Sequence, residues 1–249
     1  MPRLSVIIIT RNEAANIADC LDSVAFADER IVVDGGSEDD TVQIANSKGA
    51  RVLSHPWQGF GVQKNFALAQ ATGDWVFSID ADERVGPALA AAIEKAMNDR
   101  QYDGFEMPRR SIFCGRAMRF SGWYPDRVLR LFRRGRGNFT DDIVHERVVC
   151  DGKVGRLSEP LTHRAVLKLE DALVRLDRYS TASAEMKLAA GRRVSFMTGI
   201  GHGLFAFFKA YVLRAGFLDG REGFLLAVLI AEHSYYGYMK AWLRSRDRK

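Results

Sequence analysis

The sequence predicts an α/β fold, with a mostly parallel sheet covered by helices on both faces and a helical extension at the C-terminal end. Short apolar runs alternate with helix-like stretches over the first hundred residues. The first run, residues 4–9, is continuous and β-branched, as expected of a strand buried on both faces. From about residue 168 the apolar positions recur at helical spacing. We therefore expect one domain over residues 1–165, with halves 1–100 and 101–165, and a helical region over 166–249.

The expected elements follow in chain order. The first half alternates strands and helices, which favours βαβ units and a parallel sheet: strands at 4–9, 30–34, 51–54 and 75–79, and helices at 16–24, 39–48, 62–71 and 87–97. Pro87 suits the first turn of the last of these helices. The second half predicts short strands and then three long helices: strands at 105–107, 127–132, 146–150 and 154–157, and helices at 168–190, 197–213 and 221–244.

The composition is that of a globular protein with an excess of basic charge. Of 249 residues, 47% are hydrophobic and 27% charged, and the net charge is +5. Residues 109–136 hold nine arginines and one acid, Asp126. Such an excess suggests an anionic partner: a nucleic acid, a phosphorylated substrate or an anionic membrane. The three cysteines are far apart and read as reduced thiols in a cytosolic protein, and the N-terminus does not resemble a secretion signal.

Two apolar stretches near the C-terminus fall short of the roughly 20 residues that a membrane span needs. Residues 203–218 are interrupted by Lys209 and Arg214, and residues 224–231 are only eight long. Their aromatic residues, mixed with Lys and Arg, fit an amphipathic surface at a membrane interface. Ordinary packing in a core is the alternative.

Three polar clusters follow strands of the predicted sheet, at residues 10–13, 34–37 and 80–82. Ligands of open α/β sheets bind outside the carboxyl ends of the strands, where these clusters are expected to meet. Asp80 and Asp82 are one residue apart at a strand end, so both can reach one divalent cation. Oxygen ligands favour Mg²⁺ or Mn²⁺, held by one or two carboxylates and substrate phosphate oxygens. The sequence thus predicts a diphosphate–metal site.

These clusters carry a resemblance to a known family. The segments at residues 5–13, 32–37 and 63–65 (Gln-Lys-Asn), followed by Asp80-Ala81-Asp82, resemble those of the family 2 inverting glycosyltransferases, which have the GT-A fold. Segments at residues 125–127, 130–132, 144–146 and 216–220 look like the bacterial lipopolysaccharide inner-core β-1,4-glucosyltransferase subgroup. The resemblance implies metal-assisted single displacement of a hexose, with UDP-glucose as the expected donor and an inner-core sugar as acceptor.

The family resemblance also implies roles for residues near the nucleotide. Thr10, Asn12 and Glu13 would line the nucleotide pocket, and Asp34 would accept a hydrogen bond from the uracil ring. Lys64 would lie beside the diphosphate, although a solvated helix lysine is the alternative.

The remaining roles concern the metal and the proton. Asp82 would be the principal metal ligand, Asp80 would touch the ribose or the metal, and His163 would complete the metal shell unless it is structural. An inverting transfer needs a base on the acceptor side. Glu146 is the favoured base and Asp142 the second candidate, because residues 141–146 are the dense acidic cluster of the second half.

Acceptor binding is assigned to the arginine-rich middle of the chain. Arg127 and Arg130 would bind acceptor phosphates or acidic sugars bidentately, unless they form a solvated basic face. Trp123 would stack against a sugar ring, unless it is simply packed. The resemblance implies a lipid-linked or lipopolysaccharide acceptor and a cytoplasmic enzyme, peripheral on the cytoplasmic face of the inner membrane.

Two other functions compete with this one. Transfer to a polyprenyl phosphate or another cell-envelope polysaccharide acceptor is compatible with the helical tail. A non-enzymatic nucleic-acid-binding module would use the arginines, but no RNP, KH or helix-turn-helix signature is present, so we expect no nucleic-acid partner.

Overall fold

Four parallel strands build the first part of the sheet. In this computed structural model, which describes residues 2–140, 147–192 and 194–246, the strands are β1 (Leu4–Thr10), β2 (Glu29–Asp34), β3 (Arg51–Ser54) and β4 (Trp75–Ser78). They lie in the order β3-β2-β1-β4. Every residue of β1 is buried, because both faces of the sheet are covered.

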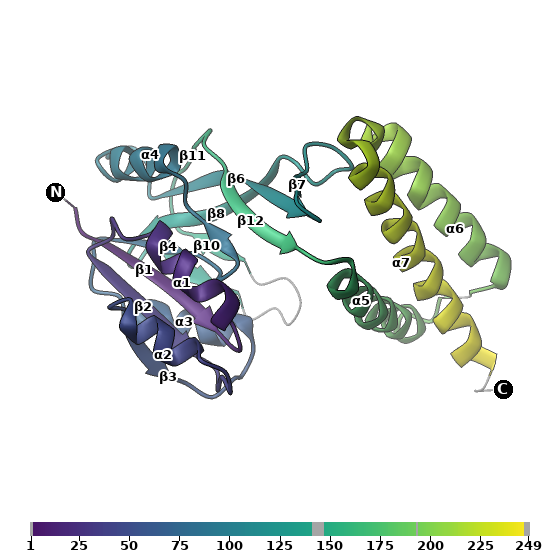
Figure 1. Cartoon of the computed structure of the whole chain (residues 1–249), viewed down its shortest axis with the longest axis horizontal. Helices are drawn as coiled ribbons and strands as arrows, with labels where there is room; N and C mark the ends of the chain where they lie inside the picture. The colour runs from purple at the N-terminus through teal and green to yellow at the C-terminus, as the bar shows by residue number, and fades with distance from the viewer. Residues whose placement is uncertain (1, 141–146, 193, 247–249) are drawn as a thin grey trace. The chain divides into compact units, whose positions relative to one another are not determined.

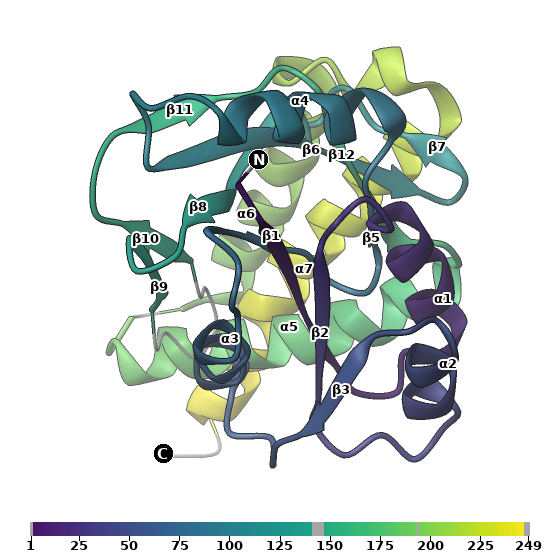
Figure 2. The same ribbon diagram turned by 90° about the vertical axis from the view of Figure 1, so that its left-hand side faces the viewer.

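Helices cover both faces of these strands. Helices α1 (Ala14–Ser23), α2 (Thr41–Ser47) and α4 (Pro87–Met97) pack into one apolar core, and α3 (Phe60–Ala69) packs into another on the opposite face. Figure 2 shows α3 on one side of β1, β2 and β3, and α1 and α2 on the other. The predicted α/β class and GT-A-like architecture are confirmed.

Antiparallel strands extend the sheet beyond β4. The order continues with β8 (Asp126–Arg133), β6 (Gly104–Phe113), β12 (Leu161–Val166) and the two-residue β5 (Glu83–Arg84). Four short strands complete the described set: β7 (Arg116–Ala117), β9 (Gly137–Phe139), β10 (Val148–Cys150) and β11 (Val154–Arg156). Strand β6 is much longer than the predicted 105–107, because pairing with β8 carries it as far as Arg109 and its last residues pair with β7.

The described chain divides into two compact units, each with its own core. Unit 1 comprises Met1–Arg109 and Asp126–His163, and unit 2 comprises Arg110–Pro125 and Arg164–Lys249. Residues 110–125, which include the end of β6 and all of β7, therefore group with the helices, whereas the expected boundary at residue 166 grouped them with the sheet. Asp219, buried in unit 2, explains the association: its carboxylate accepts hydrogen bonds from the backbone N–H groups of Arg119 and Phe120.

Unit 2 is built on three helices (Figure 1). They are α5 (Leu169–Ala189), α6 (Phe196–Phe208) with a π-helical continuation at Lys209–Leu213, and α7 (Gly220–Arg246), which a 3₁₀ turn at Gly216–Asp219 precedes. Both α5 and α6 pack against α7. The three long helices predicted from the sequence are confirmed within a few residues at each end.

One helical stretch among the described residues, Phe196–Leu213, is long and apolar enough to cross a membrane by length and composition alone. The sequence predicted no such stretch, because the apolar segment was expected to begin at residue 203. The helix begins seven residues earlier, at Phe196. Most of this stretch is not buried in the protein.

Candidate functional site

The carboxyl ends of β1 and β2 bring two of the polar clusters together. Thr10 is paired with Asp34 in the parallel register, and both side chains are buried. The hydroxyl of Thr10 donates to Asp34 Oδ1 at 3.1 Å. Strand β4 ends beside β1, with Ser78 opposite Ile7, so the segment that contains Asp80 leaves the same edge of the sheet.

The Asp34 carboxylate organises the loop that follows β2. Its Oδ2 accepts from the backbone N–H groups of Gly36 and Ser37 at 3.0 and 2.8 Å, and its Oδ1 accepts from the hydroxyls of Thr10 and Ser37. A carboxylate offers about four acceptor positions. All four are engaged, so a uracil N–H would have to displace one of these donors. The contacts of Asp34 therefore fix the loop that follows β2.

Two further contacts fix the loops at this edge. Asn12 has φ of 58°, in the left-handed region that asparagine tolerates better than most residues. Its backbone N–H donates to Ser37 Oγ, and its side-chain oxygen accepts from the N–H of Glu38, both at 2.8 Å. A Cβ atom on Gly35 would lie 2.8 Å from Trp57, so the indole packs directly against this glycine.

Glu13 lies at the N-terminal end of α1. Its backbone N–H donates to Thr41 Oγ1 at 2.8 Å, and its carboxylate accepts from the side chain of Asn16 at 2.9 Å. Thr10, Asn12, Glu13 and Asp34 therefore line one continuous rim formed by the loops after β1 and β2.

Asp80 lies between two buried cations. Lys64 of α3, 3% exposed, places its Nζ 2.9 Å from Asp80 Oδ1, and Arg130 of β8 places Nη2 2.5 Å from Oδ2. Burial disfavours the charged form of Asp80, but Arg130 and Lys64 outweigh it and hold the pKa of Asp80 well below its usual range. Lys64 therefore contacts Asp80 from a buried position, and it does not lie on the solvated face of α3.

Glu83 completes this network. It lies in β5, fully buried, before helix α4 begins at Pro87. Its Oε1 accepts from Arg130 at 2.9 Å, and its Oε2 accepts from the backbone N–H of Asp80 at 3.0 Å. Glu83 therefore fixes both the backbone of Asp80 and the guanidinium that faces it.

Arg130 was expected to bind the acceptor, and in the structure it contacts two carboxylates of the network. Its side chain is buried, and one nitrogen contacts both Asp80 and Glu83. The two carboxylates hold the pKa of Arg130 above its ordinary value against the opposing effect of burial. We assign Arg130 to positioning Asp80, because its side chain is buried and its Nη2 bonds to both carboxylates.

Asp82 lies beside His163. Strand β12 pairs with β5 so that His163 faces Glu83 across the ladder, and His163 Nε2 lies 3.3 Å from Asp82 Oδ2. Within residues 2–140, 147–192 and 194–246, no group of three or more His, Cys, Asp or Glu side chains is arranged to hold a metal ion on its own. The donor set is therefore sparse, which fits a cation whose coordination the substrate's phosphate oxygens complete.

The other two expected acceptor residues, Arg127 and Trp123, have contacts of their own. Arg127 in β8 is exposed, with contacts at 3.5 Å to the carbonyl of Leu157 and 3.9 Å to Glu106, so its acceptor role stays a prediction. Trp123 packs edge-on against Phe113 in the core of unit 2. Trp123 is therefore a packed residue, which was the alternative to stacking against a sugar ring.

Both candidate bases, Glu146 and Asp142, lie outside the described residues. The structure does describe the strand that leads to them. Asn65 donates through its side-chain amide to the carbonyl of Phe139 and accepts from the N–H of Phe139, both at 2.9 Å. This pair ties α3 to β9 immediately before residues 141–146.

Sequence reasoning missed the contributions of Glu83, Arg109 and Asn65 to this site. Arg109 donates to Asp126 at 2.6 Å and lies 3.6 Å from Glu83. A usable signal was present for Arg130: a basic residue in the middle of the apolar run 128–132 needs a buried acid as partner. Nothing in the spacing pointed to Glu83 as that acid.

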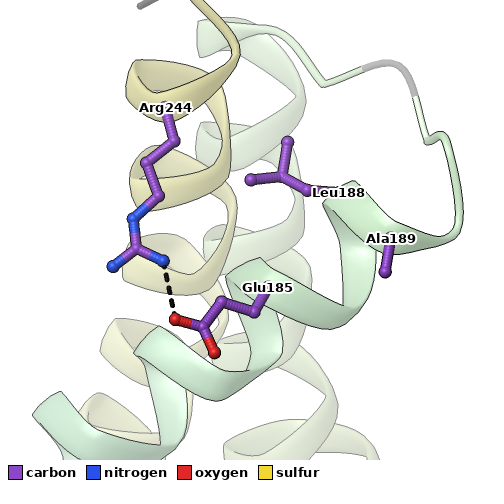
Figure 3. Close-up of a pocket in the computed structure, with 4 residues that line it drawn as sticks. All are labelled: Glu185, Leu188, Ala189 and Arg244. Atoms are coloured by element: carbon purple, nitrogen blue, oxygen red, sulfur yellow. Dashed lines mark hydrogen bonds and ion pairs between the residues drawn. The ribbon is translucent and has the colours of Figure 1, made fainter. Parts of the chain in front are cut away.

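A pocket in unit 2 offers a contrast (Figure 3). It lies between α5 and α7 and is lined by Glu185, Leu188, Ala189 and Arg244. An ion pair of 3.0 Å joins Glu185 to Arg244, and both residues are largely exposed. Its described lining residues are an acid and a base paired with each other and two aliphatic side chains, which is not the donor set of a metal site.

Comparisons with known proteins agree with the site in unit 1. Residues 5–158 match the model for glycosyl transferase family 2. The lipopolysaccharide core biosynthesis glycosyltransferase LpsC of Rhizobium meliloti is 31% identical, over 97% of this chain and 92% of its own length. An uncharacterized glycosyltransferase of Rickettsia felis is also 31% identical, over 93% of this chain and 86% of its own.

Among solved structures, glucosyl-3-phosphoglycerate synthase from Mycobacterium tuberculosis, in complex with Mn²⁺, UDP and glucosyl-3-phosphoglycerate, is 29% identical. The alignment covers 46% of this chain and 45% of that one, with a TM-score of 0.37. The family model alone covers most of the chain, and the LpsC match covers nearly all of it. The chain therefore belongs to the family 2 glycosyltransferases.

Proposed function

We propose that this glycosyltransferase moves a hexose from a UDP-sugar, with glucose the expected sugar, to an inner-core sugar of lipopolysaccharide with inversion at the anomeric carbon. One observation carries the donor half of the proposal. Asp80 and Asp82 follow β4 at the rim that Thr10, Asn12 and Asp34 form, and Asp80 is held by the buried Lys64. The similarity to LpsC over nearly the whole chain supports the acceptor half.

The residues present fit a divalent cation, Mg²⁺ or Mn²⁺. Asp82 and His163 would hold it, with Asp80 beside them, and the donor diphosphate would supply the remaining oxygen ligands. When bound, the cation neutralises the charge that develops on the departing diphosphate. Asp82 is the better placed of the two aspartates, because both oxygens of Asp80 already face cations.

The chain's own groups account for the other requirements of the transfer. Lys64 lies where a fixed positive charge would stabilise the leaving diphosphate without reorganisation. The loops after β1 and β2 are fixed by the hydrogen bonds of Asn12 and Asp34, so they offer a rigid surface to the nucleotide. Glu146, with Asp142 as second candidate, would take the proton from the acceptor hydroxyl.

The test measures release of UDP from UDP-sugars, with Mn²⁺ or Mg²⁺ and with a truncated lipopolysaccharide as acceptor. Asp82→Ala should lower the rate at least about 100-fold, because it removes the principal metal ligand. Asp22→Ala is the matched control, since Asp22 is a surface acid paired with Lys48 and should leave the rate unchanged. An Asp82→Ala enzyme with undiminished transfer would overturn the donor-site assignment.

The acceptor is tested separately from the donor. Wild-type enzyme should transfer to truncated lipopolysaccharide and not to polyprenyl phosphate, and the reverse preference would replace the proposed acceptor. Glu146→Gln should lower kcat by about 10²–10⁴, as loss of a general base does, with little change in KM for the donor. If Asp142→Asn shows that loss instead, the assignment of the base moves to Asp142.

A further inference from the structure

One face of α6 and its π-helical continuation is apolar and exposed. Met197, Leu204, Phe205, Phe208 and Val212 are between 45% and 69% exposed. Their spacing of one, three, four and seven residues places them on one side of the helix. An apolar stripe of this kind on a soluble surface marks an interaction site.

The opposite face of α6 already has its protein partner. Gly199 and Gly203 are buried against α7, where an added Cβ atom would lie 2.1 Å from Met239 Cε and 3.1 Å from Tyr235 Cβ. Ala210 is buried as well. The exposed stripe is thus not a core face left open by loose packing, because the helix is packed closely on its other side.

The charge along this segment of the chain has one sign. Between Glu185 and Asp219 the sequence contains no acid and five basic residues: Lys187, Arg192, Arg193, Lys209 and Arg214. Lys209 and Arg214 are exposed beside the stripe. Exposed apolar side chains flanked by cations complement a surface that combines hydrocarbon with negative charge.

We infer that the stripe inserts into the interfacial region of an anionic phospholipid bilayer, with α6 lying in the plane of the membrane. This goes beyond the proposed transfer reaction and does not depend on it. We do not expect α6 to cross the bilayer, because the groove of about 390 Å³ between α6 and α7 is lined by an acidic residue. Glu232 of α7 lines this groove beside Leu204, so a crossing α6 would carry a carboxylate and Lys209 into hydrocarbon.

The test uses the whole chain and flotation with vesicles of phosphatidylcholine alone or with 30% phosphatidylglycerol. Wild type should float with the anionic vesicles and be released by alkaline carbonate. Leu204→Ser/Phe205→Ser/Phe208→Ser should weaken binding at least about 30-fold, since three half-exposed apolar anchors are lost. Lys209→Gln/Arg214→Gln should weaken it about 25-fold, at about fivefold for each cation.

Val174→Ser/Met186→Ser is the matched control, because both residues are exposed apolar side chains on α5. It should bind like wild type, and circular dichroism should show that all variants fold. The inference is overturned if wild type ignores anionic vesicles, if the triple variant or the control breaks this pattern, or if carbonate fails to release the protein. It is also overturned if wild type is a dimer in solution that the triple variant dissociates without any vesicle binding, since the face would then be a subunit interface.

Discussion

Replacing Arg130 by glutamine should expose how much the carboxylate network depends on one cation. In the wild type, Arg130 Nη2 lies 2.5 Å from Asp80 and 2.9 Å from Glu83, and the residue is only 7% exposed. The substitution removes the charge but keeps a polar side chain of similar reach. Two carboxylates that shared a buried cation are then left to other partners.

The size of the effect follows from what those partners are. Removing one member of a buried ion pair costs about 3–5 kcal/mol, because the remaining charge stays buried without compensation. Asp80 keeps Lys64 at 2.9 Å, but the cation left to the fully buried Glu83 among the described residues is the more distant guanidinium of Arg109, at 3.6 Å. We therefore expect a loss near the lower end, about 3 kcal/mol in the free energy of unfolding at pH 7.

The measurement is hydrogen exchange of peptides from Leu4–Thr10, which reports the opening of unit 1 separately from unit 2. Arg109→Gln is the matched control: Arg109 also bonds a carboxylate, Asp126, but is partly exposed and should cost less than about 1 kcal/mol. A loss below about 1 kcal/mol for Arg130→Gln would refute the reasoning. If the single variant does not fold, the double variant Arg130→Gln/Glu83→Gln should fold better, and an unrescued double variant would contradict the network.

The same network predicts the response to acid. The pKa of Asp80 is held well below its usual range, so the stability that its charge contributes is complete above about pH 4 and is lost as the pH falls further. Arg130→Gln removes a cation that lowers this pKa, and unit 1 should then lose less additional stability between pH 4 and pH 2 than in the wild type. Equal acid slopes would contradict this. Asp34→Asn should lower the free energy of unfolding by about 1–3 kcal/mol, because the amide N–H₂ group would face backbone N–H donors that now bond to the carboxylate. An unchanged Tm would contradict this expectation. Gly35→Ala should cost about 1–3 kcal/mol through the clash of its Cβ with Trp57, as measured by urea unfolding, and wild-type stability would show that the indole can move aside. Burial raises the pKa of the Cys20 thiol, so a thiol reagent at pH 8 should modify Cys20 only after denaturation, and equal native labelling of all three cysteines would disprove its burial.

Much of the fold could be predicted because the signals are local. The β-branched run of β1 and the alternation of strands and helices determine β1 to β4 and α1 to α4 within a few residues. The long helices of unit 2 also follow from periodicity. Strands β5 and β12 could not be predicted in this way, since a two-residue strand has no pattern and β12 carries the polar residues His163 and Arg164.

The site was predictable to the extent that it lies at strand ends. Thr10, Asp34 and Asp80 follow parallel strands, so their meeting at one edge is a consequence of topology. The contact between Arg130 and Glu83 was not predicted, because it depends on the antiparallel register of β8 beside β4 and on β5, which is paired by β12. Such pairings join residues 54 to 80 positions apart, and spacing along the chain does not encode them.

Two consecutive residues of α3 contact two different segments, the one that follows β4 and the strand β9. Lys64 contacts Asp80, and the next residue, Asn65, is bonded in both directions to the backbone of Phe139, two positions before residues 141–146. Under the proposed function, Lys64 contacts a carboxylate of the donor site, and Asn65 fixes the strand end that precedes the candidate bases in sequence. A displacement of α3 would therefore disturb both contacts together.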